Sequence, residues 1–369
     1  MDRPNKELMQ DPLVAPESSV VRQIEDDRPR IPVGLLSRQE KDRLIERGML
    51  GLYRWYVARS QDHRNWNPDR DFDWRAFRKD HSYEMNRILE GFFAVEQYVP
   101  DYVTSLMKVI RRSHGRSHFH LRWGSEEEKH ADLWYNAVLF SERRTPEWLK
   151  NYMGLLRGQE WNVPWEDPVH MIFYTVFQER ATQLNYLNTA VIARGQSDKP
   201  QFANDADPEL VKIASTIAVD EAAHYNFFLE GARLYLYYYP AEAIQAMHDV
   251  IKYFAMPAGP LIPDYDEFSE IVYRAGIYGP REHARDVVQI ALENLGVENR
   301  KALETGIKRG RLVPDEDGNL RETAIFEGID FTYIDAAVKR IYAKVSKFER
   351  ETGHADVDPT VFVSNYRSP

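Results

Sequence analysis

The sequences EEKH at residues 127–130 and EAAH at residues 221–224 are two copies of one motif, Glu-x-x-His. On a helix the Glu and His of this motif lie on one face, about one turn apart, so that a single metal ion can contact both. Each copy follows an apolar helical stripe that contains one further glutamate, Glu96 or Glu179. Four carboxylates and two imidazoles that face one another in a helical bundle form a site for two iron or manganese ions. The pattern therefore indicates oxygen chemistry at a dinuclear metal centre.

The competing interpretation is that these acids are surface residues or structural salt bridges. All four glutamates occupy positions where the helical period places a core residue, and burying four carboxylates without cations is very costly. Metal coordination resolves that conflict. A third match at residues 351–354 is a chance occurrence, because Gly353 is expected to end a helix there and no glutamate on an apolar stripe precedes it.

Hard carboxylate oxygens with only two imidazoles suit iron, with manganese as the other candidate. Zinc fits less well, because it prefers four ligands with more nitrogen or sulfur. The assignment that follows gives one metal Glu96 and His130, gives the other Glu179 and His224, and bridges the two with Glu127 and Glu221.

The hydrophobic pattern predicts an all-α protein, with a ferritin-like four-helix bundle core and additional N- and C-terminal helices. Pro100 should kink the first bundle helix or open its backbone hydrogen bonding locally. Two other bundle helices are expected to start at Asp-Pro pairs, residues 167–168 and 207–208. Further helices are expected near residues 37–59, 241–254, 264–277, 281–308 and 331–353.

Three regions are expected along the chain: an extended or partly disordered arm at 1–35, the metal-binding domain at 36–310, and a C-terminal loop and helix extension packed on that domain at 311–369. The stretch 310–330 is read as a loop or short hairpin. The 369 residues contain no cysteine and carry a net charge of −10, which argues against a nucleic-acid binder. No apolar run approaches the roughly 18 residues of a membrane span. The absence of a secretory signal favours the cytoplasm.

Five stretches resemble the soluble acyl-[acyl-carrier-protein] desaturase family, the plant stearoyl-type enzymes and their bacterial relatives. FQERAT matches a helix motif of the family as it stands, and EEKHADL and IAVDEAAH are similar to its two Glu-x-x-His motifs. The resemblance runs from about residue 66 to 279. The stretches lie at residues 95–100, 127–133, 177–182, 217–224 and 255–259.

The resemblance implies a centre of two iron ions that reacts with oxygen and removes two hydrogens from an acyl chain. It implies an acyl carrier protein that presents the chain, a ferredoxin that supplies electrons, and a homodimer. It also implies that Asp220 and Trp66 deliver electrons. Thr182 lies one turn beyond Glu179 and is expected to be a hydroxyl near the oxygen site. Plain packing for Trp66 and a backbone bond for Thr182 are the alternatives. Met171 stands where plant members commonly have glycine, so chain length and double-bond position are open.

The stretch HGRSHFHLR, residues 114–122, is interpreted as a solvated basic connection between helices, with a zinc site or a carrier-docking patch as alternatives. Three other functions compete with desaturation: hydroxylation or oxidation of an acyl chain in a specialised pathway, iron storage or peroxide handling, and a purely structural role. Other candidates for docking a carrier protein are Arg143, Arg144, Arg274 and Arg281.

Overall fold

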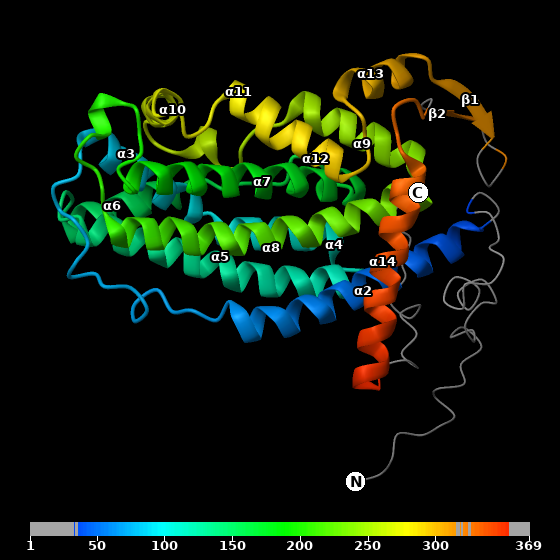
Figure 1. Ribbon diagram of the computed structural model, residues 1–369, viewed down its shortest axis with the longest axis horizontal. Coiled ribbons are helices and arrows are strands. Elements are labelled where there is room, and N and C mark those ends of the chain that lie inside the picture. The colour runs from blue at the N-terminus through cyan, green and yellow to red at the C-terminus, as the bar shows by residue number, and fades with distance from the viewer. Residues whose placement is uncertain (1–32, 34–35, 315–317, 319, 324–325, 354–369) are drawn as a thin grey trace, which may run out of the picture.

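Long helices packed side by side form the computed structural model, which describes residues 33, 36–314, 318, 320–323 and 326–353. Figure 1 shows α7 (Pro168–Ala193) and α8 (Pro208–Tyr238) side by side. Helices α3 (Tyr83–Glu96) and α4 (Val99–Ile110) pack along α5 (His114–Phe140). Helix α2 (Arg38–His63) packs along α5 and α8. These elements confirm the predicted all-α class and its ferritin-like four-helix core. None of the described helices is long and apolar enough to cross a membrane.

Aspartate caps fix where two bundle helices begin. The Asp167 carboxylate accepts hydrogen bonds from the backbone of Val169 and His170, and Pro168 takes the first helical position. Asp207 caps α8 in the same way, with Pro208 behind it. Proline suits that position because its missing N–H would have no partner there. Both predicted starts are confirmed.

Pro100 divides the first bundle helix in two. Helix α3 ends at Glu96 and α4 begins at Val99, with Pro100 in its first turn. Proline has no N–H to continue the ladder of the preceding turn. The Tyr102 hydroxyl donates to the carbonyl oxygen of Val95 at 2.9 Å across the break. The backbone bonding is therefore opened locally between α3 and α4, as predicted, and Glu96 is the last residue of its helix.

The remaining elements surround this core. Helix α6 (Pro146–Leu156) was not predicted, although Thr145 caps it and Pro146 takes its first position. The helix expected at 281–308 is interrupted after α12 (Gln289–Asn294), where Gly296 adopts a φ of +78°. The hairpin expected within 310–330 is confirmed by the antiparallel pair β1 (Arg311–Pro314) and β2 (Leu320–Thr323). The elements are α6 (Pro146–Leu156), η3 (Pro200–Phe202), α9 (Pro240–Tyr253), η4 (Gly259–Leu261), α10 (Tyr265–Arg274), α11 (Pro280–Glu282), η5 (His283–Val288), α12 (Gln289–Asn294), α13 (Arg300–Lys308), β1 (Arg311–Pro314), β2 (Leu320–Thr323) and α14 (Phe331–Thr352).

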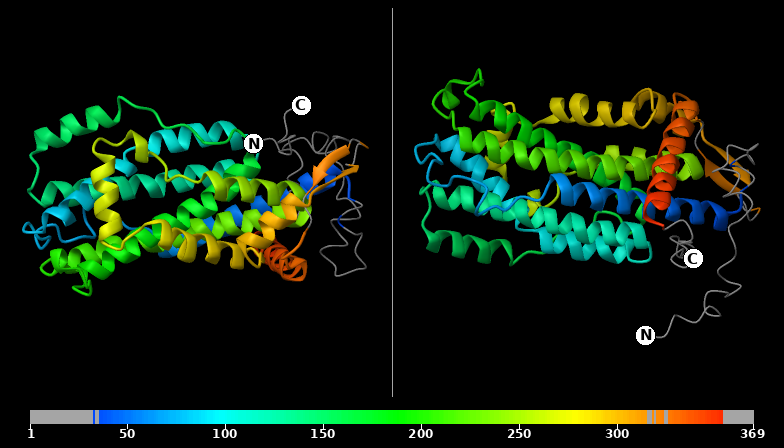
Figure 2. Two further views of the ribbon diagram at one scale, coloured as in Figure 1. Left: turned by 90° about the horizontal axis from the view of Figure 1, so that it is seen from above. Right: turned by 60° about the horizontal axis from the view of Figure 1, so that its bottom comes forward.

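Helix α14 crosses the end of the bundle, where it contacts α2 and α8 (Figure 2). It ends as predicted at Gly353, whose φ is +74°. His354 of the chance motif lies outside the described residues. The arm expected at 1–35 does too, apart from Val33. The division into a domain at 36–310 and an extension at 311–369 stays a prediction.

The prediction of a solvated basic connection at residues 114–122 is wrong. Ser113 caps α5, so these residues form its first turns. Arg116 is buried and donates to the Tyr235 hydroxyl and the Pro168 carbonyl. His120 is buried too, with its Nε2 3.1 Å from the Val103 carbonyl oxygen. The described residues also place none of these histidines in a group of three or more metal-binding side chains.

Candidate metal centre

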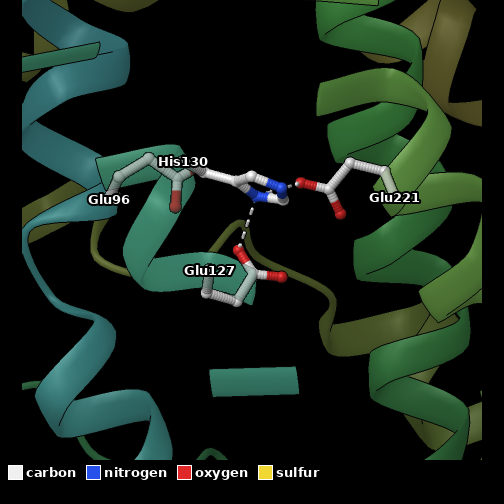
Figure 3. A group of neighbouring side chains, drawn as sticks. All are labelled: Glu96, Glu127, His130 and Glu221. Carbon is white, nitrogen blue, oxygen red and sulfur yellow. Dashed lines mark hydrogen bonds and ion pairs between the residues drawn. The ribbon is translucent and has the colours of Figure 1, made fainter. Parts of the chain in front are cut away.

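Four helices deliver the six predicted ligands to one place in the bundle. Glu96 closes α3, α5 carries Glu127 and His130, α7 carries Glu179, and α8 carries Glu221 and His224. Each of the six side chains is buried, with an exposed fraction of 4% or less. Figure 3 shows the His130 ring between the carboxylates of Glu127 and Glu221, with Glu96 beside it. The carboxylates therefore occupy core positions on the apolar faces where these helices meet.

The six side chains form two overlapping groups of four, and each group brings its ligand atoms within 4.8 Å of one another. Nδ1 of His130 lies 3.2 Å from Glu127 and 3.5 Å from Glu221. Nδ1 of His224 lies 3.0 Å from Glu127 and 3.4 Å from Glu179. One group holds Glu96, Glu127, His130 and Glu221, and the other holds Glu127, Glu179, Glu221 and His224. The two shared residues are those predicted as bridges.

Several buried atoms of this cluster have no hydrogen-bond partner among the described residues. They include both carboxylate oxygens of Glu221, Oε2 of Glu179 and Nδ1 of His224. The short His224 contacts are ion-pair distances without hydrogen-bond geometry. A buried polar group without a partner costs about 1–3 kcal/mol, and more when it is charged. Divalent cations would satisfy these atoms, so the donor set fits a metal centre.

Burial and neighbouring charged groups shift the pKa values of the carboxylates in the cluster. Burial, followed by the nearby Glu127, raises the pKa of Glu96 to about 8. Burial and the Glu221 charge raise the pKa of Glu179 well above its usual range. Burial also acts on Glu221, but the neighbouring imidazoles of His130 and His224, each 3.5 Å away, outweigh it and lower that pKa. The cluster therefore retains protons that bound cations would displace, and metal binding is expected to release them.

A carboxylate binds the outer nitrogen of each histidine. His130 Nε2 lies 3.3 Å from Asp220, and His224 Nε2 lies 3.0 Å from Glu126. Asp220 immediately precedes the motif on α8 and Glu126 immediately precedes the motif on α5, so each motif orients the histidine of the other. A carboxylate on the outer nitrogen fixes the tautomer and makes the inner nitrogen a better ligand.

Arg64 joins these two outer carboxylates. Its Nη1 lies 3.2 Å from Glu126 and 3.1 Å from Asp220. Glu126 also accepts hydrogen bonds from Tyr56 and Ser60 of α2. The arginine compensates the charge of both carboxylates, which are 1–3% exposed.

Trp66 connects this network to the half-buried loop before α3. The Trp66 indole nitrogen donates to Asp220 at 2.9 Å, and the ring stacks parallel to that of His130 at 6.1 Å between centroids. The Lys129 ammonium lies over the Trp66 ring, 4.3 Å from the ring centroid. Trp66 and Asp220, both predicted as functional, are thus brought together with His130. The role in electron delivery stays a prediction.

Sequence reasoning missed Glu126, Arg64, Tyr56 and Ser60. The motif itself held a signal for Glu126, because it stands at the position that Asp220 takes in the second copy. No comparable signal exists for Arg64, since only the packing of α2 against α5 and α8 brings it to the two carboxylates.

A cavity of about 660 Å³ opens beside the cluster. Glu96 and Glu127 line it, so a molecule inside would lie next to the candidate metal centre. Tyr186 donates a hydrogen bond to Glu96 from the cavity wall, and the indole of Trp123 donates to Glu179 at 3.0 Å. Most of the other lining side chains are apolar or aromatic. Exposed lining residues mark the opening: Ala255, Glu270, Tyr273 and Pro280.

Thr182 and Met171 both line the cavity. The Thr182 hydroxyl donates to the carbonyl oxygen of Gln178 at 3.1 Å and accepts from the Gln178 amide. Thr182 therefore makes a hydrogen bond to its own helix backbone and also lines the cavity. Its catalytic role stays a prediction. Met171 is 1% exposed.

A helical bundle with paired glutamates and Glu-x-x-His motifs on its inward faces defines the ferritin-like class of carboxylate-rich metal proteins. The model of the family described as "Fatty acid desaturase" matches residues 61–313, which include all six predicted ligands. The chain therefore belongs to this fatty acid desaturase family.

Curated relatives include stearoyl-[acyl-carrier-protein] 9-desaturase 5 of Arabidopsis thaliana, 27% identical over 57% of this chain and 54% of that protein. Stearoyl-[acyl-carrier-protein] 9-desaturase 1 of Oryza sativa subsp. indica is 28% identical over 62% of this chain and 60% of that protein. The chain thus spans little more than half the length of these relatives. An X-ray structure assigned to the acyl-ACP desaturase DesA2 of Mycobacterium tuberculosis aligns with 68% of this chain and 94% of that chain, at 17% identity and a TM-score of 0.48.

Proposed function

We propose that this protein oxidises a fatty acyl chain carried on acyl carrier protein, and that it removes two hydrogens to form a double bond. The observation that carries the proposal is the position of Glu96 and Glu127, which belong both to the candidate metal centre and to the wall of the cavity. A chain held in that cavity lies beside the ligands. Iron bound there would supply the redox chemistry that activates dioxygen. Dioxygen is reduced to water by the two hydrogens from the chain, with two electrons and two protons supplied from outside.

The shape and lining of the cavity support an extended apolar substrate. Along α7 its wall runs from Met171 to Tyr186, which is about 22 Å at 1.5 Å per residue. Aromatic and aliphatic side chains provide most of the lining, and such walls bind alkyl chains through buried apolar area. An iron store or a peroxide scavenger needs no cavity of this kind.

Electrons would reach the centre through Trp66, Asp220 and His130. The three side chains form one connected path from the half-buried loop to the candidate ligand His130. A ferredoxin is the proposed donor, as the family resemblance implies, and a homodimer is the proposed assembly.

Product analysis tests this function. The protein is loaded with iron, reduced anaerobically, and exposed to oxygen with saturated acyl carrier proteins of several chain lengths. Mass spectrometry should find a product that lacks two hydrogens. A product that gains one oxygen would establish the hydroxylase alternative, and consumption of oxygen without any change in the acyl chain would contradict the proposal.

Docking of the carrier should be sensitive to salt. Arg274 and Arg281 adjoin Tyr273 and Pro280 at the cavity opening, although Arg274 also pairs with Glu270 at 2.5 Å. An acidic carrier could bind these cations despite the net charge of −10, and salt would screen the attraction. We expect Arg281→Glu to raise the KM for the carrier-bound chain about tenfold at low salt while kcat changes little.

The matched control for Arg281 is Lys347→Glu on α14, an exposed site at the other end of the fold. It makes the same charge change and should leave KM unaltered. Equal KM shifts in both variants, or turnover of free fatty acid that matches carrier-bound substrate at every salt concentration, would refute carrier docking at the opening.

Met171 should limit how deeply the acyl chain enters. Its side chain, with Leu106 and Thr175, lines both the main cavity and a void of about 10 Å³ behind it. Met171→Ala would join the two spaces, at a stability loss of about 2–5 kcal/mol. We expect this variant to accept chains longer by a few carbons, or to shift the oxidised carbon, with metal content unchanged.

The volume-conserving variant Met171→Leu is the control and should keep the wild-type product profile. Profiles that are identical in wild type, Met171→Ala and Met171→Leu would show that Met171 only packs the core.

A further inference from the structure

A hydrogen-bonded pair of polar side chains lies in the otherwise apolar wall near the cavity opening. Tyr278 and His283 both line the cavity, and the Tyr278 hydroxyl lies 2.8 Å from Nδ1 of His283. The His283 ring stacks on Phe254 at 4.7 Å between centroids, with an angle of 20° between the planes. The pair therefore has a fixed orientation. Its neighbours Ala255 and Pro280 are exposed lining residues, which places the pair by the opening.

A local irregularity of the helix holds His283 in place. Residues 280–294 form one continuous helical stretch beside α7 (Figures 1 and 2), and its segment η5, which His283 begins, is π-helical. Single π-helical turns inside helices occur frequently at functional sites. Arg180 of α7 donates to the carbonyl oxygen of Asp286 within η5 at 3.1 Å. Arg180 follows the candidate ligand Glu179, so the π-helical turn is attached directly to the helix of the metal centre.

The protonation pattern of the pair leaves one donor free. Burial, then the charge of Arg300, lowers the pKa of His283, so the imidazole is neutral near pH 7. Burial raises the pKa of Tyr278, so its phenol keeps its proton. Tyr278 has no other acceptor among the described residues, so its hydroxyl donates to Nδ1 of His283. The imidazole proton then lies on Nε2, which has no hydrogen-bond partner in the described part of the chain.

We propose that Nε2–H of His283 donates a hydrogen bond to the thioester carbonyl of the bound acyl chain, with Tyr278 as the residue that fixes the imidazole tautomer. This assignment rests on the proposed function and adds the part of the substrate that is recognised. A carbonyl is the first strong acceptor of an acyl thioester, and it stays near the opening while the alkyl chain fills the interior. Anchoring it determines which carbon lies beside Glu96 and Glu127. His283 is thus a specificity-determining residue.

Binding of two probes that differ only in the carbonyl tests the assignment. Dodecanoyl-pantetheine has the thioester, and S-dodecyl-pantetheine is the thioether without the carbonyl oxygen. Titration calorimetry with the full chain, iron-loaded and without reductant, measures affinity in the absence of turnover. Wild type should bind the thioester about fivefold more tightly than the thioether, which is the contribution of one neutral hydrogen bond.

His283→Phe keeps the stacking on Phe254 and removes the donor, so it should abolish this preference while the affinity for the thioether is retained. Tyr278→Phe leaves the His283 ring in place but removes the hydroxyl that keeps the imidazole proton on Nε2. The preference for the thioester should therefore fall in part. With carrier-bound substrate, His283→Phe should also spread the double bond over neighbouring positions. Retained thioether binding shows that a variant is folded, and Tyr278→Phe tests the assignment even if His283→Phe is unstable.

Equal affinity of wild type for the two probes, or a preference that survives in both variants, would overturn the role of His283. Failure of both probes to bind at all would instead count against the proposed function. The two failures are therefore distinguishable.

Discussion

Glu221→Ala is expected to lose nearly all bound metal, and Glu179→Ala to lose at least one of two ions. Glu221 belongs to both ligand groups, whereas Glu179 belongs to one. Each substitution also leaves the facing histidines and carboxylates buried without their charge partner. Elemental analysis of the purified variants after iron loading gives the number of ions per chain.

Glu128→Ala is the matched control, because Glu128 stands beside Glu127 in the same motif and is exposed. It should keep the wild-type content of about two ions. Two ions per chain in both Glu179→Ala and Glu221→Ala would defeat the ligand assignment.

The largest effect away from the ligands is expected at the outer carboxylates. Glu126→Gln and Asp220→Asn keep the size of the side chain but remove the charge that holds Nε2–H of His224 or His130. Loss of such a partner typically weakens metal binding about 10–100-fold, which is about 1.4–2.8 kcal/mol. Competition with a chelator should show this weakening in either variant, with the free energy of unfolding of the metal-free protein changed much less.

The symmetry of the network makes this prediction specific. Each carboxylate acts on the histidine of the opposite motif, so both variants should weaken retention to a similar extent. Glu128→Gln again serves as the control. Wild-type retention in Glu126→Gln would mean that the cross-bonded carboxylates only pack the bundle.

Local chemistry explains why the ligand set could be predicted. A carboxylate on a buried stripe departs from the apolar pattern of a core-facing helix. Four such carboxylates together with two histidines are explained by one dinuclear metal site. The Asp-Pro pairs at 167–168 and 207–208 marked helix starts for equally local reasons. The break at Pro100 follows from its missing N–H.

Features that depend on packing between distant segments were missed or misread. Residues 114–122 look solvated because two arginines and three histidines lie among them. In the fold, Arg116 is buried and donates a hydrogen bond to the Tyr235 hydroxyl, which is 119 residues away in the sequence. Arg64 and the cavity depend in the same way on α2, α9 and α10, whose placement no local pattern specifies.

Helix interruptions show a further limit. The pattern at 281–308 reads as one helix, but Gly296 takes a positive φ and approaches Tyr333 and Ile334 of α14. The contact between α14 and this turn arises only when the C-terminal helix docks. Likewise, nothing in the sequence around His283 distinguishes a π-helical turn from an α-helical one.

Two metal ions are expected among six side chains, those of Glu96, Glu127, His130, Glu179, Glu221 and His224. Anomalous diffraction at the iron absorption edge, on crystals of the iron-loaded protein, tests this assignment most directly. We expect two anomalous peaks, one within the group that contains Glu96 and His130 and one within the group that contains Glu179 and His224. A single peak, or iron located elsewhere in the molecule, would contradict the assignment.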